Sequence, residues 1–284
     1  MQQRQLGKTG QMLSMVGFGG IIVMDEEPAS AARLVAQAVE RGVTYFDVAP
    51  SYGNAQERLG PALEPYRSSV FLACKTGKRT REEAWAELQT SLKLLRTDHV
   101  DLYQLHGVTT MAEVEQIFGP AGALEAFVKA RAQGLTRFLG FSAHSEEAAL
   151  ALMERFSFDT ILFPLNWVTW HQGHFGPRVV AKAQSLGMGI LCLKALAKRP
   201  WKEGETRRWP KCWYSPVDTF DEASLALRFT LSLPVTAAVS PSHAELLWWA
   251  CDIADKFTPL TADEAKQVAA LSSGVPYIFP QRHD

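Results

Sequence analysis

The stretch VTYFDVAPSYGNAQERLG, residues 43–60, runs from an apolar segment into a glycine-containing turn. β-Branched and aromatic residues dominate its first positions, as expected of a buried strand. The strand ends at Asp47, and Tyr52 follows in the turn. Because burial of an unpaired carboxylate is costly, Asp47 needs either solvent or a basic partner from another strand.

Outside this stretch, short apolar runs alternate with longer segments of helical period, each pair taking about 25 to 35 residues, the length of a βα unit. The eight predicted strands span residues 15–20, 43–49, 70–76, 100–106, 137–143, 160–166, 189–196 and 236–240. Predicted helices include residues 30–42, 81–95, 124–134 and 221–233. Eight such units in 284 residues predict an α/β fold, a (β/α)₈ TIM barrel.

No linker or low-complexity tract marks a boundary, so we expect residues 1–284 to form a single barrel domain. Residues 4–15 are expected to form a short β-hairpin that closes the bottom of the barrel. The rival fold is a doubly wound nucleotide-binding sheet, since Gly17 and Gly19 make the first half of G-x-G-x-x-G. The third glycine would fall at Ile22, which favours the barrel.

The charge balance points to small-molecule partners. With 29 basic and 30 acidic residues the net charge is −1, so no strong field draws the chain to nucleic acid or an anionic membrane. No signal-peptide or membrane-spanning segment is present, and we predict a cytoplasmic protein. The four cysteines form no C-x-x-C pair, and we predict no metal site.

Titratable residues recur where the predicted strands end. Asp47 lies near the end of strand two, Lys75 ends strand three, and His106 closes strand four, while Tyr52 lies on the turn after strand two. Catalytic groups of TIM barrels lie at the carboxyl ends of the strands, and adjacent strands are about 4.8 Å apart. We therefore expect these four side chains to form one cluster, although each alone also fits a cap, a rim position or a satisfied core residue.

These residues resemble the signature of the aldo-keto reductase superfamily, in which an aspartate is followed by a tyrosine, a glycine and E-x-x-L-G. The segments LACKT and LYQLH resemble its lysine and histidine segments. The resemblance runs along nearly the whole chain. It implies a barrel that reduces aldehydes or ketones with a nicotinamide cofactor and without a metal.

The resemblance assigns a role to each member of the cluster. Tyr52 would be the general acid for the carbonyl oxygen, and the Lys75 ammonium would lower the pKa of the phenol. Asp47 would keep Lys75 charged in a dry site. His106 would orient the carbonyl, in a protonation state that the sequence leaves open.

The resemblance also implies a cofactor site with several departures from the family pattern. It places Gly19 and Gly20 where backbone approaches the cofactor, with Asp47 beside them. Further expected cofactor contacts are Ser142, Asn166, Leu193, Lys194, Ser240 and Ser242. Ser142 is followed by alanine rather than asparagine, and Leu193 replaces a stacking aromatic residue. No lysine or arginine follows strand eight for a 2'-phosphate, which argues for NAD, whereas family habit favours NADP. We favour NADP, and NAD stays possible.

Two loop features lie above the expected mouth. Residues 197–214 carry six basic and two acidic residues and are expected either to clamp a pyrophosphate or to form a solvated basic loop. The tryptophans of the loops after strands six and seven suggest an aromatic substrate wall: Trp167, Trp170, Trp201 and Trp213.

Two other functions remain open at this point. Some relatives bind nicotinamide nucleotides as sensors or regulatory subunits with weak turnover. A barrel lyase or isomerase without redox chemistry is the third reading, and it would bind no nicotinamide nucleotide.

Overall fold

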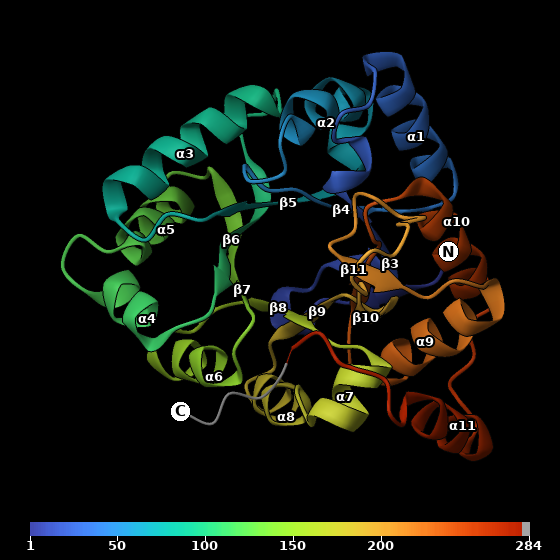
Figure 1. The fold of residues 1–284 in the computed structure, drawn as a ribbon. Helices are drawn as coiled ribbons and strands as arrows, with labels where there is room; N and C mark the ends of the chain where they lie inside the picture. Colours follow the sequence, from blue (N-terminus) through green and yellow to red (C-terminus); the bar gives the residue numbers. More distant parts are fainter. Residues whose placement is uncertain (280–284) are drawn as a thin grey trace.

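A closed barrel of eight parallel strands forms the centre of the molecule in the computed structural model, which describes residues 1–279 (Figure 1). The order around the barrel is β12-β3-β4-β5-β6-β7-β8-β9. The strands are β3 (Val16–Gly19), β4 (Tyr45–Asp47), β5 (Phe71–Thr76), β6 (Val100–Val108), β7 (Thr136–Ala143), β8 (Thr160–Pro164), β9 (Gly189–Leu193) and β12 (Ala237–Val239). The predicted (β/α)₈ barrel is confirmed, and the doubly wound alternative is wrong because the sheet closes on itself.

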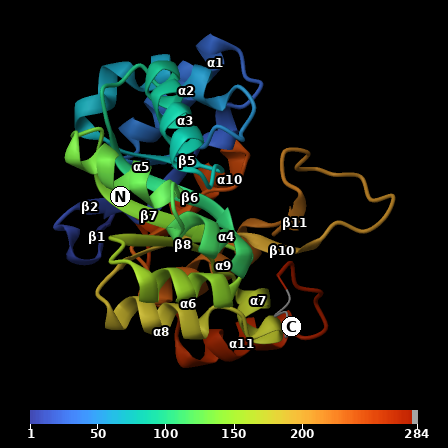
Figure 2. The ribbon, with the colours of Figure 1, turned by 90° about the vertical axis from the view of Figure 1, so that its left-hand side faces the viewer.

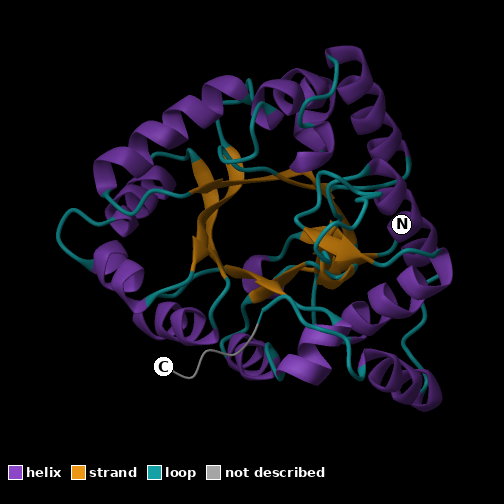
Figure 3. Cartoon of the chain, viewed as in Figure 1, coloured by secondary structure: helices purple, strands orange, loops and turns teal. Residues whose placement is uncertain are grey.

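Helices form the outer layer (Figure 3). They are α1 (Pro28–Glu40), α2 (Ala55–Leu63), α3 (Arg81–Leu94), α4 (Met111–Phe118), α5 (Ala123–Ala132), α6 (Glu146–Arg155), α7 (Trp167–Gly173), α8 (Pro177–Ser185), α9 (Phe220–Ser232), α10 (Ala244–Asp255) and α11 (Ala262–Ser272). Threonine or serine caps several of them, as Thr80 does by accepting from the Glu83 N–H. Gly60 lets α2 approach α3, because a Cβ there would lie 2.3 Å from the Leu94 carbonyl oxygen. None of the helices in residues 1–279 is long and apolar enough to cross a bilayer.

The barrel interior follows the two-residue period of its strands. On β5, Phe71 and Ala73 belong to the inner apolar cluster, and Lys75 is the next residue of the same face. On β6, Leu102 belongs to this cluster, and Gln104 lies opposite Lys75 in the strand pairing. The interior is therefore apolar below and polar at the carboxyl ends of the strands.

The expected N-terminal hairpin is present as β1 (Gln3–Gln5) and β2 (Met12–Ser14). Its Leu6 and Leu13 are buried in the inner apolar cluster, and a Cβ on Gly189, the first residue of β9, would lie 2.4 Å from Leu6. The hairpin thus closes the bottom of the barrel. A second hairpin, β10 (Ala197–Pro200) and β11 (Tyr214–Pro216), projects from the opposite end (Figure 2).

Several strands are shorter than predicted. The run 189–196 forms a strand only as far as Leu193, because Lys194 has φ +70° and turns the chain out of the sheet. The glycine-rich segment after β3 becomes a short 3₁₀ helix, Gly20–Val23. Apolar composition alone does not show where a strand leaves the sheet.

Candidate active site

A buried ion pair lies at the carboxyl ends of β4 and β5. The ammonium group of Lys75 contacts Asp47 Oδ1, and both side chains are almost fully excluded from solvent. The other oxygen of this carboxylate, Oδ2, accepts hydrogen bonds from the Tyr45 hydroxyl and from Gln104 Nε2, each at 3.1 Å. Each oxygen of Asp47 therefore has its own donors, as a buried charge requires.

Tyr52 lies next to this pair. Lys75 Nζ is 5.3 Å from the centroid of the Tyr52 ring. Burial raises the pKa of the Tyr52 phenol, and the charge of Lys75 opposes this rise without cancelling it. Burial is the largest single influence on Lys75 and lowers its pKa, but the charge and hydrogen bond of Asp47, together with Tyr52 and Cys74, more than offset it. The pKa of Lys75 is therefore raised, and the group stays an ammonium.

His106 completes the predicted cluster. Its ring meets the Tyr52 ring edge-on, with centroids 5.7 Å apart, and its Nδ1 lies 3.3 Å from the Ser51 hydroxyl oxygen. Burial, helped by the charge of Lys75, lowers the pKa of His106 to about 3. The imidazole is therefore neutral at physiological pH, which answers a question that the sequence left open.

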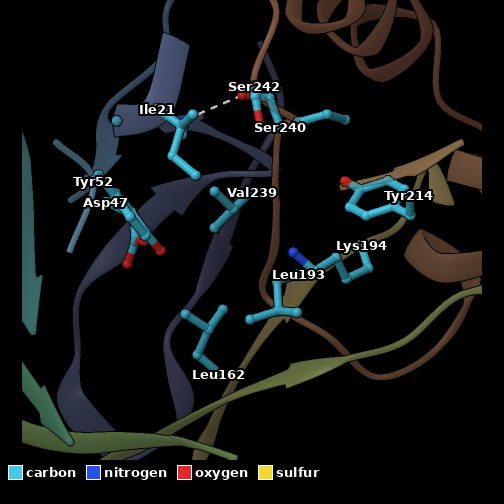
Figure 4. A pocket seen from close by; sticks show the side chains of 13 residues that line it. Ile21, Asp47, Tyr52, Leu162, Leu193, Lys194, Tyr214, Val239, Ser240 and Ser242 are labelled. Atoms are coloured by element: carbon cyan, nitrogen blue, oxygen red, sulfur yellow. Dashed lines mark hydrogen bonds between the residues drawn. The ribbon is translucent and has the colours of Figure 1, made fainter. Parts of the chain in front are cut away.

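A pocket opens beside the cluster and encloses about 470 Å³ of empty space, its mouth included (Figure 4). Asp47 and Tyr52 lie on one side, and Lys194 extends its ammonium group toward the centre from the opposite side (Figure 4). The remaining lining residues are Gly19, Gly20, Ile21, Leu162, Leu193, Tyr214, Val239, Ser240, Pro241 and Ser242. Most of the expected cofactor contacts therefore surround one cavity.

Comparison with known proteins now decides the family, because the model of the aldo/keto reductase family matches residues 16–216. The chain belongs to this family. A solved aldo-keto reductase of Bacillus halodurans in its holo form, AKR11C1, superposes with a TM-score of 0.76 at 25% identity, covering 98% of each chain.

Curated relatives give the same family over shorter stretches. An uncharacterized oxidoreductase of Bacillus subtilis, YqkF, is 31% identical over 50% of this chain and 49% of its own length. The L-galactose dehydrogenase of Arabidopsis thaliana is 26% identical over 69% of this chain and 66% of its own length. This chain spans about half to two thirds of the length of these relatives.

In this member of the aldo/keto reductase family, the glycines at the end of β3, Gly19 and Gly20, serve packing within the protein. A Cβ on Gly19 would lie 2.5 Å from the Ser240 carbonyl oxygen, and one on Gly20 would lie 2.8 Å from the Val48 side chain. Their backbone does line the pocket. Neighbouring strands therefore also need the space that these glycines leave, and the approach of their backbone to a cofactor stays a prediction.

Ser142 and Asn166 do not line this pocket. The Ser142 hydroxyl oxygen accepts a hydrogen bond from the Gly107 N–H at 2.7 Å. Asn166 Oδ1 caps α7 by accepting from the Thr169 N–H, whereas its Nδ2 is buried without a partner among the described residues. The amide group Nδ2 of Asn166 and the hydroxyl proton of Ser142 therefore remain available to donate further hydrogen bonds.

Lys194 is an unusual residue of the pocket. Its backbone is left-handed, a conformation rare for residues other than glycine. Its Nζ lies 5.3 Å from the centroid of the Trp213 ring and 5.0 Å from that of Tyr214. Burial lowers the pKa of Lys194 to about 8, and no carboxylate among residues 1–279 opposes that shift. Such a cation is suited to an anionic ligand.

The basic residues of the loop 201–213 are largely paired with partners in the protein. Lys211 Nζ donates to the carbonyl oxygens of Ile22 and Met24 and contacts the Glu26 carboxylate at 3.0 Å. Arg208 contacts Asp218 and Glu245, each at 3.1 Å. The loop is thus pinned by Lys211 to the segment after β3, whereas Arg208 is 52% exposed and forms its ion pairs at the surface. A clamp over a pyrophosphate stays a prediction.

The expected wall of four tryptophans is only partly formed. Trp167 is buried, and Trp170 packs against Phe229, so neither faces the mouth. Trp201 Nε1 donates to the Cys212 carbonyl oxygen and holds the hairpin loop together. Trp213 is 53% exposed, and its ring centroid lies 5.3 Å from Nζ of the pocket residue Lys194, so it does stand beside the pocket.

Residues that the sequence analysis missed support the predicted ones. Tyr45 and Gln104 bind Asp47, and Tyr214 lines the pocket beside Lys194. The two-residue period of the strands could have revealed Tyr45 and Gln104, because each lies two positions before a predicted site residue. No group of three or more His, Cys, Asp or Glu side chains in residues 1–279 is arranged to hold a metal ion.

Proposed function

We propose that this protein is an NAD(P)H-dependent reductase of aldehydes or ketones, with Tyr52 as the general acid. The observation that carries the proposal is the array Asp47–Lys75–Tyr52 at the edge of a pocket, with a neutral imidazole against the phenol. Membership of the aldo/keto reductase family supports it. The physiological carbonyl compound is not specified by these residues.

The chain's own groups suit the protonation of a carbonyl oxygen. The raised pKa of Tyr52 keeps the phenol protonated, so a proton is available for transfer. The nearby Lys75 ammonium stabilises the tyrosinate that remains after transfer. If the Ser51 hydroxyl donates to Nδ1 of His106, then Nε2 carries the ring proton and donates to the carbonyl oxygen.

A nicotinamide cofactor, when bound, supplies the reducing equivalent for the carbonyl carbon. The residues of the pocket, together with Asn166 outside its lining, fit such a group. The buried Nδ2 of Asn166, which has no partner within residues 1–279, offers a donor for a carboxamide. Lys194, together with Ser240 and Ser242, offers a cation and hydroxyls for phosphate oxygens, and Leu193 offers an apolar surface for the ring.

We further propose NADP as the preferred cofactor. The segment after β12 has no lysine or arginine of its own, but the pinned loop brings two basic residues to it. Arg208 contacts Glu245 in the first turn of α10, and the Lys211 backbone N–H donates to His243 Nε2. Both cations are paired with carboxylates in the protein. In our proposal one of them exchanges its carboxylate partner for the 2'-phosphate, whose recognition needs a positive charge. If Arg208→Met changed the preference of the protein from NADPH to NADH, this assignment would be supported.

The test is oxidation of NADPH at 340 nm with a generic aldehyde such as 4-nitrobenzaldehyde. Tyr52→Phe should abolish turnover while leaving the fold and cofactor binding intact. Tyr66→Phe is the matched control, because the Tyr66 side chain lies on the 3₁₀ helix Glu64–Ser69, away from the pocket residues. Wild-type turnover in Tyr52→Phe would disprove the acid assignment.

A nucleotide-binding sensor with weak turnover is the second candidate. The pinned loop favours it, because Lys211 must release three contacts before the loop can open, which slows exchange of a bound nucleotide. Titration of NADPH and NADH against tryptophan fluorescence separates the two candidates. Tight binding without turnover across a broad carbonyl panel would favour the sensor, and no binding at all would exclude both.

A further inference from the structure

The strand β6 contains an irregularity at the position of His106. In the pairing with β7, Leu105 lies opposite Phe141 and Val108 lies opposite Ala143, so two residues of β6 face the single residue Ser142. An extra residue of this kind bends a strand and re-aims its side chains. The second of the two is Gly107, whose φ of +61° is a left-handed conformation.

The peptide group between His106 and Gly107 is held at both ends by side chains. Its carbonyl oxygen accepts a hydrogen bond from Arg79 Nη2 at 2.7 Å. Its N–H donates to the Ser142 hydroxyl oxygen, also at 2.7 Å. These two bonds replace the regular strand-to-strand bonds that a bulge disrupts, and they fix the rotation of this peptide group.

Arg79 is itself held in place. It lies on the loop between β5 and α3, is only 9% exposed, and donates from Nε and Nη2 to Glu113 Oε1 at 3.1 and 2.8 Å. The other oxygen of Glu113 accepts from the N–H groups of Thr109 and Thr110. Burial opposes the charge of Glu113, but hydrogen bonds from Thr109 and Arg79 lower its pKa to about 2, so it stays a carboxylate.

We propose that Arg79 is a positioning residue for His106, acting through the bulged His106–Gly107 peptide. Glu113 holds the guanidinium, the guanidinium holds the peptide, and the peptide aims the imidazole toward the site of the carbonyl oxygen. Ser142 holds the other end of the same peptide in addition to its proposed cofactor contact. The inference rests on the proposed reductase function, because the orientation of His106 matters only if this residue binds the carbonyl oxygen.

The expected effect concerns orientation. A shift of about 1 Å in a catalytic group can cost about 100-fold in rate. Arg79→Met should therefore lower kcat for 4-nitrobenzaldehyde by about 10- to 100-fold and leave the Kd for NADPH within twofold. It should also lower the stereoselectivity of reduction of the aldehyde labelled with deuterium at its carbonyl carbon, because His106 no longer fixes which face is presented.

Three further variants sharpen the test. Arg81→Met, two positions away on the surface and paired with Glu125, is the matched control and should behave as wild type. Arg79→Lys restores a donor for one partner and should recover part of the activity. Glu113→Gln can still accept from the threonine N–H groups but no longer pairs with the guanidinium, so a smaller loss in the same direction is expected. The Glu113→Gln variant serves as the test if Arg79→Met does not fold.

Unchanged kcat and stereoselectivity in folded Arg79→Met, or in Glu113→Gln if that variant alone folds, would overturn the proposal. A wild-type protein without turnover would instead defeat the proposed function. In that case NMR of ¹⁵N-histidine-labelled protein still tests the positioning. The His106 ring signals should shift and broaden in Arg79→Met and match wild type in Arg81→Met; identical spectra in both variants would overturn the positioning role.

Discussion

Lys75 and Asp47 form an ion pair inside the barrel, almost without access to water. Breaking such a pair on one side leaves an uncompensated buried charge, which costs about 3 to 5 kcal/mol. We predict that Lys75→Met destabilises the protein by this amount and abolishes carbonyl reduction. The double variant Asp47→Asn/Lys75→Met should regain much of the stability but none of the activity. Urea denaturation and the 340 nm assay measure both; recovered activity in the double variant would contradict the role of the pair.

The second oxygen of Asp47 tests a finer point. Tyr45→Phe removes one of its two donors and leaves a well-filled site. Because hydrogen bonds to charged groups contribute about 1.5 to 3 kcal/mol, we expect a loss of unfolding free energy in that range. Tyr66→Phe is the control, since its hydroxyl has no hydrogen bond with another described residue. A loss no larger than that of the control would show that Gln104 alone is enough for Oδ2.

His144 should make stability depend on pH. Its imidazole stacks on Phe279, and burial lowers its pKa to about 4 in the folded protein from about 6.5 in the unfolded chain. Between these values the unfolded chain binds more protons, so the free energy of unfolding falls as the pH drops from 6.5 to 4. The slope from His144 is at most about 1.4 kcal/mol per pH unit.

Urea denaturation at several pH values checks this slope. His144→Phe keeps the ring stack and should flatten the dependence, leaving the part due to His106, His171 and His243, whose pKa values are also lowered by burial. Tyr66→Phe, which changes no histidine and no carboxyl group, should retain the wild-type slope. Equal slopes in all three proteins would rule out a contribution from His144.

Lys194 should make cofactor binding depend on pH. With a pKa of about 8, it is charged below that value and neutral above it. If it holds a phosphate group, the Kd for NADPH should rise as the pH passes from 7 to 9, by about 10-fold for one lost charge-assisted bond. Lys194→Met should bind weakly at both pH values. Lys198→Met, which removes the pair between Lys198 of β10 and Glu222 of α9, is the control.

Lys211 should control the rate of cofactor release. Removing its contacts to Ile22, Met24 and Glu26 frees the loop on one side of the pocket. We expect Lys211→Met to raise the dissociation rate of NADPH by about 10-fold or more, given about 1 kcal/mol or more per lost contact. Stopped-flow fluorescence measures this rate. An unchanged rate would mean that the loop does not have to open for the cofactor to leave.

The sequence predicted the barrel and the pairing of Asp47 with Lys75, because both follow from the regular repeat of strand and helix along the chain. Asp47 ends β4 and Lys75 lies one residue before the end of β5, whereas β6 continues two residues past His106, where the sequence had predicted its end. The apolar runs of these strands are easy to recognise, and similar height on neighbouring strands brings the three residues together. The positions of Trp167 and Trp170 could not be predicted, because α7 begins at Trp167 and turns these rings toward other helices. The role of Arg79 was equally hidden, since a bulge and a left-handed glycine are consequences of tertiary pairing.

The N-terminal hairpin at the bottom of the barrel also bears on the order in which ligands bind and leave. Leu6 and Leu13 fill the bottom of the barrel, so the pocket opens at the other end, beside Trp213 and the pinned loop. A dinucleotide and a carbonyl compound would share this entrance, and the one that binds deeper has to bind first and dissociate last. The architecture thus favours a compulsory order of entry and exit, which product-inhibition kinetics would reveal.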